Sequence, residues 1–235
     1  MPSSLQSYFS ATRRPIYSAA LILPFFVIYH LGTFLLRTTY MNGADALIVR
    51  LLSMLSVHSI FASALVLLLC FIFWQLKSGA SWKIDSGRLL GLFAESCLFA
   101  LLLFFLTGWL SLHLSRASSP HGSPGVIEKL VLYCGAGIYE ELVFRGFLLG
   151  VLLLLFTGPA RMKRVPAAIA ATMLAALIFS SFHYIGATGD PFSLVSFLQR
   201  TFGGLFFSAL FVTRGFGVTA ASHALYDILV GLLLA

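Results

Sequence analysis

Several residues whose side chains can carry out chemistry lie inside apolar stretches of this sequence. Glu140, Glu141 and Arg145 fall within six residues of one another in the run IYEELVFRGF, residues 138–147. A charged side chain at the centre of a lipid bilayer costs roughly 2.5–3.5 kcal/mol on insertion scales. Three charged residues so close together in such a stretch therefore need a functional or structural reason.

The spacing of these three residues separates two tasks. Glu141 and Arg145 are four residues apart, so on a helix they share one face and can form an ion pair. Glu140 is rotated about 100° from that face and lacks this partner, so it is free to act as a general base. A buried Glu–Arg pair can also simply tie two helices together, and this structural interpretation stays open for Glu141 and Arg145.

Two histidines further along the chain are each four residues from a second side chain that would share the same face of a helix. His183 follows Phe179, and His223 precedes Asp227. Two imidazoles and a carboxylate are suitable ligands for Zn²⁺ with one open position, so Glu140, His183 and His223 are candidate zinc ligands. Equally, the same three groups could hold and deprotonate a water molecule without a metal.

Other ionisable residues in the apolar stretches have a plainer interpretation. A single histidine in a membrane helix is more often a packing residue that forms a hydrogen bond, and we predict this role for His30, His58 and His113. Glu95 and Arg200 are predicted to pair with each other or to reach a membrane interface.

The composition indicates which class of protein must position these residues. Of the 235 residues, 59% are hydrophobic and only 10% are charged, and the mean hydropathy is +0.97. Soluble domains carry about 25% charged residues, so the sequence predicts a polytopic membrane protein. A formal charge of +7 would suggest nucleic acid in a soluble protein. Here the basic residues flank apolar segments, which favours topology and anionic lipid headgroups as the explanation and predicts no nucleic-acid partner.

We predict an all-α fold, a transmembrane helical bundle of about seven spans. A helical span needs about 20 apolar residues, and the candidates are 15–36, 51–76, 89–112, 126–157, 166–187, 192–213 and 216–235. As a straight helix, 126–157 would be roughly 48 Å long, which exceeds the hydrocarbon core of a bilayer. It is therefore tilted or kinked, or it consists of two helices, which would give eight helical segments.

Basic residues between the spans predict the orientation of the chain. With seven spans and the N-terminus inside, nine Lys and Arg fall in inner loops and four in outer loops. The positive-inside rule then places the N-terminus in the cytoplasm. The turn-rich stretch 118–125 is the clearest loop. It divides the chain into a block of three spans without motifs, 1–114, and a core, 125–235, that holds nearly all the polar residues described above.

The core resembles a known family of membrane enzymes. This is the CPBP or Abi family of intramembrane CAAX-processing and bacteriocin-processing proteases, which includes the type II CAAX prenyl endopeptidases. Its three motifs are EExxxR, FxxxH and HxxxN/D. They match, complete and in order, Glu140-Glu141-x-x-x-Arg145, Phe179-x-x-x-His183 and His223-x-x-x-Asp227. Each motif alone is weak, whereas the set of three is specific.

The resemblance implies an intramembrane endopeptidase whose site lies inside the bundle. Glu140 matches the glutamate that activates the attacking water, and His183 and His223 match the histidines that hold this water or a metal. Glu141 with Arg145 would shape the cavity and tune the base. The implied substrate is the C-terminal region or a hydrophobic segment of a membrane-associated protein, or a lipidated peptide, and the implied location is a prokaryotic inner membrane.

Asp227 stands at a motif position that this family usually fills with Asn and sometimes with Asp. An ionised carboxylate cannot donate a hydrogen bond to an oxyanion. Asp227 would therefore stay protonated, orient His223, or be a metal ligand itself.

Two other classes of function stay open on the sequence. Carboxylates and histidines inside a membrane also mark ion pathways, as in a transporter or proton relay, although no inverted repeat favours one. A non-catalytic bundle that binds a partner, such as a bacteriocin-immunity protein, is the other alternative.

The predicted spans place the two motif histidines at different depths in the membrane. Counted from one inner plane, His183 lies about 25 Å into its span and His223 about 10 Å, so straight, upright spans would keep the two imidazoles apart.

Overall fold

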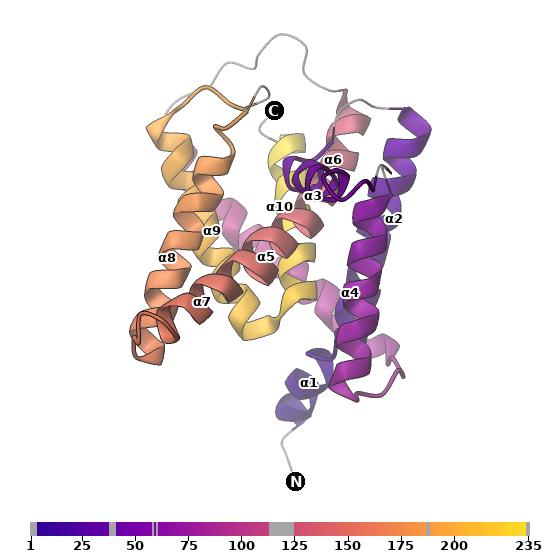
Figure 1. The fold of residues 1–235 in the computed structure, drawn as a ribbon. Helices are drawn as coiled ribbons and strands as arrows, with labels where there is room; N and C mark the ends of the chain where they lie inside the picture. The colour runs from indigo at the N-terminus through magenta and orange to yellow at the C-terminus, as the bar shows by residue number, and fades with distance from the viewer. Residues whose placement is uncertain are drawn as a thin grey trace.

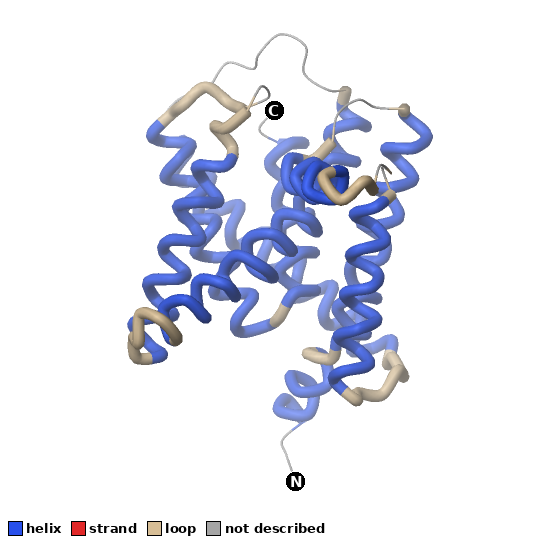
Figure 2. Tube along the Cα trace, in the orientation of Figure 1, coloured by secondary structure: helices blue, strands red, loops and turns tan. Residues whose placement is uncertain are grey.

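The computed structural model describes residues 4–37, 41–57, 59, 61–112, 125–186 and 189–233, and every element assigned within them is helical (Figures 1 and 2). For these residues the predicted all-α fold is confirmed. In chain order the helices are α1 (Ser4–Thr12), α2 (Pro15–Leu36), α3 (Gly43–Ser53), α4 (Ala62–Ser78), α5 (Ser86–Leu112), α6 (Val126–Glu140), the π-helix η1 (Glu141–Leu148), α7 (Leu149–Thr157), α8 (Arg164–Phe182), α9 (Leu194–Arg214) and α10 (Phe216–Leu233).

Five of the described helices are long and apolar enough to cross a membrane, namely α2, α5, α8, α9 and α10. The apolar helix α4 is shorter, with 17 residues. These lengths do not confirm the predicted count of about seven spans. The expected span 51–76 is wrong, because α3 ends at Ser53 and the chain turns through Ser56, whose φ of +63° is incompatible with a right-handed helix.

The segment 126–157 forms one uninterrupted helical path through α6, η1 and α7. In Figure 1 this path descends obliquely from α6 to α7, which accounts for its length. The first motif, Glu140 to Arg145, spans the junction of α6 with the π-helix. Short π-helical segments inside α-helices occur frequently at functional sites.

Helix α10 lies at the centre of the bundle and contacts α2, α5, α6 and α9. Its first half, FGVTAASHA, is buried throughout and consists mostly of small residues, which let neighbouring backbones approach closely. A Cβ atom on Gly137 of α6 would lie only 2.5 Å from the carbonyl oxygen of Ala220. The two backbones are therefore in contact, and this brings the end of α6 beside His223.

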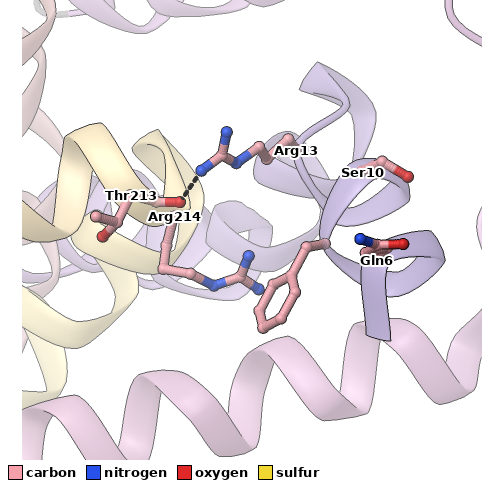
Figure 3. A pocket seen from close by; sticks show the side chains of 6 residues that line it. Gln6, Ser10, Arg13, Thr213 and Arg214 are labelled. Carbon is pink, nitrogen blue, oxygen red and sulfur yellow. Dashed lines mark hydrogen bonds between the residues drawn. The ribbon is translucent and has the colours of Figure 1, made fainter. Parts of the chain in front are cut away.

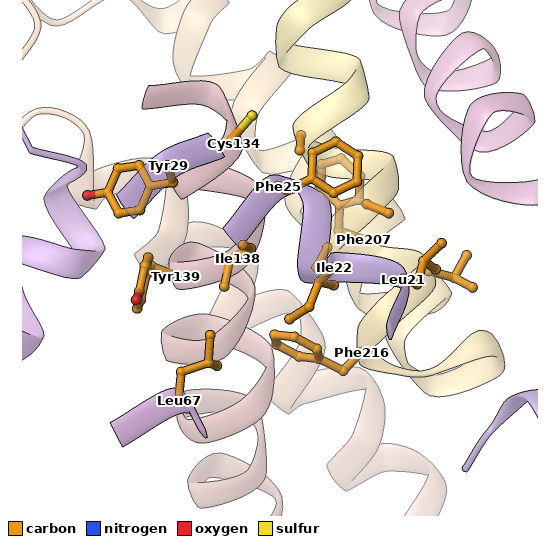
Figure 4. Close-up of a cluster of buried hydrophobic side chains, with 14 of the residues drawn as sticks. Leu21, Ile22, Phe25, Tyr29, Leu67, Cys134, Ile138, Tyr139, Phe207 and Phe216 are labelled. Carbon is orange, nitrogen blue, oxygen red and sulfur yellow. The ribbon is translucent and has the colours of Figure 1, made fainter. Parts of the chain in front are cut away.

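Apolar side chains from four helices fill the space around this contact (Figure 4). Tyr29 of α2, Ile138 of α6, Phe207 of α9 and Phe216 of α10 are all buried in one cluster. Because these helices share one core, the position of the first motif is fixed from several sides.

Helix α1 covers the turn between α9 and α10 at one end of the bundle (Figure 3). Arg13 donates to the carbonyl of Thr213, and Arg214 donates to Glu95 of α5 through Nε at 2.7 Å and Nη2 at 3.0 Å. A surface cavity of about 470 Å³ lies there. The predicted pairing of Glu95 with Arg200 is wrong, because Glu95 lies at this end of the bundle and binds Arg214.

Candidate active site

The three motif segments meet at the carboxylate of Glu140. Glu140 is the last residue of α6, His183 follows the last residue of α8, and His223 lies within α10. Oε2 of Glu140 is 3.9 Å from Nε2 of His183 and 3.8 Å from Nε2 of His223. Both distances exceed a direct hydrogen bond and suit a water molecule that bridges the groups.

The depth difficulty expected from the sequence does not hold. That count placed the starts of α8 and α10 in one plane. The chain turns from α9 into α10 at Gly215, whose φ of +86° requires glycine, and all of the first nine residues of α10 are buried. Helix α10 therefore begins inside the bundle, and His223 reaches the level of His183 after about two turns.

Glu141 links the first and third motifs. Its Oε1 accepts hydrogen bonds from Nη1 of Arg145 at 2.9 Å and from Nδ1 of His223 at 2.7 Å. The predicted Glu141–Arg145 pair is therefore present and fully buried. Because Nδ1 of His223 donates to Glu141, its Nε2 points to Glu140.

Aromatic rings enclose this buried ion pair. The guanidinium of Arg145 lies 4.4 Å from the ring centroid of Phe179 and 5.8 Å from that of Phe207, and its Nη2 donates to the carbonyl of Gly204 at 3.2 Å. The ring of Phe207 also stacks on His223 at 4.4 Å. The phenylalanine of the second motif thus packs against the arginine of the first.

His183 lies on the more open side of the site. Its side chain is 24% exposed, whereas that of His223 is 5% exposed. Nδ1 of His183 lies 2.9 Å from the carbonyl oxygen of Phe179. A carbonyl only accepts, so Nδ1 carries the proton and a neutral His183 presents the lone pair of Nε2 toward Glu140.

Part of the chain matches a known protein family. Residues 122–229 match the family described as type II CAAX prenyl endopeptidase Rce1-like. This segment is therefore similar to the Rce1-like family. The family consists of proteases, which supports the prediction that this chain is a peptidase. The match and the five apolar helices together support the prediction that it is an integral membrane protein. Searches among curated proteins and among solved structures gave no match.

The Rce1-like segment contains Asp227 on the open side of the site. Its Oδ2 lies 3.5 Å from Nε2 of His223, and its side chain is 23% exposed. Because Nδ1 of His223 binds Glu141, the bond that fixes the imidazole tautomer comes from Glu141 rather than from Asp227. Asp227 instead faces the same nitrogen as Glu140.

The predicted zinc ligands Glu140, His183 and His223 converge, with Nε2 of the two histidines 3.9 and 3.8 Å from Oε2 of Glu140. Among the residues that the structure describes, no group of three His, Cys, Asp or Glu side chains is already arranged around a common metal position. Zinc binding by these three residues stays a prediction.

Outside the Rce1-like segment, Asn42 also contacts the site, and sequence reasoning missed it. Its Nδ2 donates to Oε1 of Glu140 at 2.9 Å. Its Oδ1 accepts from the backbone N–H groups of Ala44 and Asp45 at 2.9 and 3.4 Å. The residue pair Asn-Gly before an apolar run indicates a helix N-cap, but nothing in the sequence indicates that this cap reaches Glu140.

Contacts with Tyr29 of α2 and Phe182 of α8 hold the start of α3 in place. The Tyr29 hydroxyl donates to Oδ2 of Asp45 at 2.6 Å and accepts from the Asn42 backbone N–H at 3.3 Å. Burial raises the pKa of the Asp45 carboxyl. A Cβ atom on Gly43 would lie 3.2 Å from the ring of Phe182, so α3 begins directly against the end of α8.

His30 has a hydrogen-bond partner of its own. Nε2 of His30 lies 2.7 Å from the hydroxyl of Tyr139, which is the hydrogen-bonded packing arrangement predicted for it. His58 and His113 lie outside the described residues.

Proposed function

We propose that this chain is an intramembrane endopeptidase that uses Glu140 to activate a water molecule. The observation that carries the proposal is the convergence of Glu140 Oε2 with Nε2 of His183 and of His223 at 3.9 and 3.8 Å. The Rce1-like match supports the reaction class. It also favours a substrate that is membrane-associated and prenylated on a cysteine three residues before its C-terminus.

A water molecule between these three groups would form three hydrogen bonds. It would donate to the Glu140 carboxylate and to the lone pair of Nε2 on His183. Oxygen atoms of Glu140, Glu141 and Asp227 lie 3.8, 2.7 and 3.5 Å from the nitrogens of His223, an environment suited to a cationic imidazolium. That imidazolium would donate from Nε2 to the water oxygen.

The reaction then needs two proton transfers. Glu140 takes a proton from the water as the oxygen attacks the peptide carbonyl carbon, and the Nε2–H group of His223 stabilises the negative oxygen of the tetrahedral intermediate. The protonated Glu140 next gives its proton to the leaving nitrogen as the C–N bond breaks. The products are a carboxylic acid and an amine.

The proposal is tested directly with purified protein in lipid nanodiscs. The probe is a farnesylated peptide that ends three residues after the modified cysteine, and mass spectrometry measures the released tripeptide. Release by the wild-type protein supports the function. Identifying a membrane protein that stays uncleaved in a deletion strain would then name the natural substrate.

We assign Asn42 as a positioning residue for Glu140, so that the N-terminal block 1–114 would contribute to the site. Its hydrogen bond occupies Oε1 and leaves Oε2 facing the two imidazoles. Asn42→Ser keeps a capping oxygen for α3 but is too short to reach Glu140. We expect kcat to fall roughly 10- to 100-fold, as for other groups that orient a reacting side chain, with KM and the melting temperature unchanged.

Asn42→Asp is the matched variant for this test. Aspartate caps a helix as well as asparagine does, but it replaces the donor by a carboxylate opposite Glu140. Its kcat should fall at least as far as that of Asn42→Ser. Wild-type kcat in both variants would show that Asn42 only caps α3.

Asp227 is expected to tolerate an amide but not an apolar side chain. Asp227→Asn restores the more usual family residue and can still exchange a hydrogen bond with His223, so it should keep substantial activity. Asp227→Leu removes the polar group that lies beside Nε2 of His223, so this variant should lose most activity. The measurement is kcat/KM for both variants beside wild type, and full activity of Asp227→Leu would contradict a role for this residue.

Metal analysis of the same three proteins by mass spectrometry tests the zinc hypothesis. If zinc is bound and Asp227 is a ligand, Asp227→Asn should lose the metal. Stoichiometric zinc in wild type and in Asp227→Asn would instead leave Glu140, His183 and His223 as the ligands.

A further inference from the structure

Arg200 of α9 is connected to the proposed site through one residue, Asp190. The backbone N–H of Asp190 donates to the carbonyl of His183 at 2.9 Å. The side chain of Asp190 accepts from Nη2 of Arg200 at 2.5 Å. The guanidinium also lies 5.3 Å from the ring centroid of Tyr184, the residue that follows His183. Arg200 is therefore held at the open side of the site, next to the second motif.

The guanidinium of Arg200 is only partly used. Its Nη1 is buried and has no hydrogen-bond partner among the described residues. Asp190, the partner of Nη2, is 49% exposed, and an ion pair with such an exposed partner adds little stability and exchanges readily. Arginine presents a planar fork of donors that fits a carboxylate with two parallel hydrogen bonds. The present partner, Asp190, is itself a carboxylate, so the position of the guanidinium suits a carboxylate ligand.

The charges around the site make this cation important. Glu140, Glu141 and Asp227 would repel an anionic group, and the buried cation Arg145 is already paired with Glu141. Arg200, with 28% of its side chain exposed, can offset this repulsion from the open side. In an extended substrate, a carboxylate three residues beyond the cleaved bond lies about 10 Å away, and Arg200 is connected to His183 through the single residue Asp190.

We propose that Arg200 binds the free carboxylate at the C-terminus of the substrate and displaces Asp190 when it does so. This inference rests on the proposed endopeptidase function and adds to it the side chain that recognises the terminal carboxylate of the substrate. Asp190 holds the guanidinium in place until the substrate arrives.

The test compares two farnesylated peptides that differ only in a C-terminal free acid or a C-terminal amide. For the wild-type protein we expect kcat/KM to be roughly 10- to 100-fold higher for the acid, since a charge-assisted bidentate contact is lost with the amide. Arg200→Gln should lower kcat/KM for the acid to the value for the amide and leave the amide unchanged. Arg200→Lys should keep part of the preference, because it retains the charge without the fork.

Asp190→Asn is the matched control from the other side of the ion pair. It removes the competing carboxylate, so KM for the acid should fall while the rate with the amide stays the same. Merely losing a structural ion pair would instead change both peptides alike.

The outcomes separate this inference from the function on which it rests. Equal kcat/KM for acid and amide in the wild type, or an undiminished preference in Arg200→Gln, overturns the role of Arg200 and leaves the endopeptidase intact. If Arg200→Gln does not fold, the wild-type ratio and Arg200→Lys decide. Cleavage of neither peptide by the wild type removes the proposed function, and this inference with it.

Discussion

Replacing Glu140 by glutamine is expected to abolish peptide hydrolysis and leave the protein folded. Glutamine has nearly the same shape and can still accept the hydrogen bond from Asn42, but it cannot take a proton from water. General-base catalysis contributes typically 10²- to 10⁴-fold, so kcat should fall by at least that factor. The measurement is release of the tripeptide from the farnesylated probe, with the melting temperature as the check on folding.

His183→Ala and His223→Ala extend the same test. Each removes one of the two imidazoles that face Oε2 of Glu140, so each should also abolish cleavage. Wild-type turnover by Glu140→Gln would falsify the glutamate mechanism. It would mean that Glu140 has a packing role and that another group activates the water.

Removing Arg145 is expected to have the largest effect on stability. The guanidinium is buried with Glu141, Gly204 and two phenylalanine rings around it. Arg145→Ala leaves the buried Glu141 carboxylate with His223 as its remaining partner, and breaking a buried ion pair costs roughly 3–5 kcal/mol. The variant should be poorly expressed, with a clearly lower melting temperature in detergent.

Two further variants sharpen this prediction. The double variant Glu141→Gln with Arg145→Gln carries no unpaired charge, so it should be more stable than Arg145→Ala. It should nevertheless be inactive, because His223 loses the carboxylate at its Nδ1. Arg164→Ala is the control, since Arg164 is exposed at the start of α8. Equal melting temperatures for wild type and Arg145→Ala would argue against a buried pair.

The sequence was sufficient to predict the contacts that follow from helical periodicity. Glu141 and Arg145 are four residues apart in the chain, and they pair in the structure. The bond from His223 to Glu141 joins residues 82 positions apart. It depends on the close packing of α6 on α10 at Gly137, which no local pattern specifies.

Asn42 was missed for a similar reason. Its contact with Glu140 depends on where the chain turns between α2 and α3 and on the anchoring of Asp45 by Tyr29. Hydropathy alone also merged the end of α3 with α4, because both are apolar and only the turn at Ser56 separates them. The depth estimate for His223 failed because a hydropathy plot cannot show that the first half of α10 is buried from its first residue onward.

Helix α1 lies at one end of the bundle, and the start of α3, with Asn42, lies toward the other (Figure 1). Arg14 ties the loop before α5 to the α1 end, through the carbonyls of Ser81 and Lys83. The arginines Arg13 and Arg14 at the α1 end and the α3 end that contacts Glu140 thus lie toward opposite ends of the described bundle. If the α1 end lies in the cytoplasm, as the positive-inside rule predicts, the α3 end faces the opposite side of the membrane, and the substrate would be expected to approach from there. The side of the membrane on which the arginines at the α1 end lie would then determine which compartment supplies the substrate.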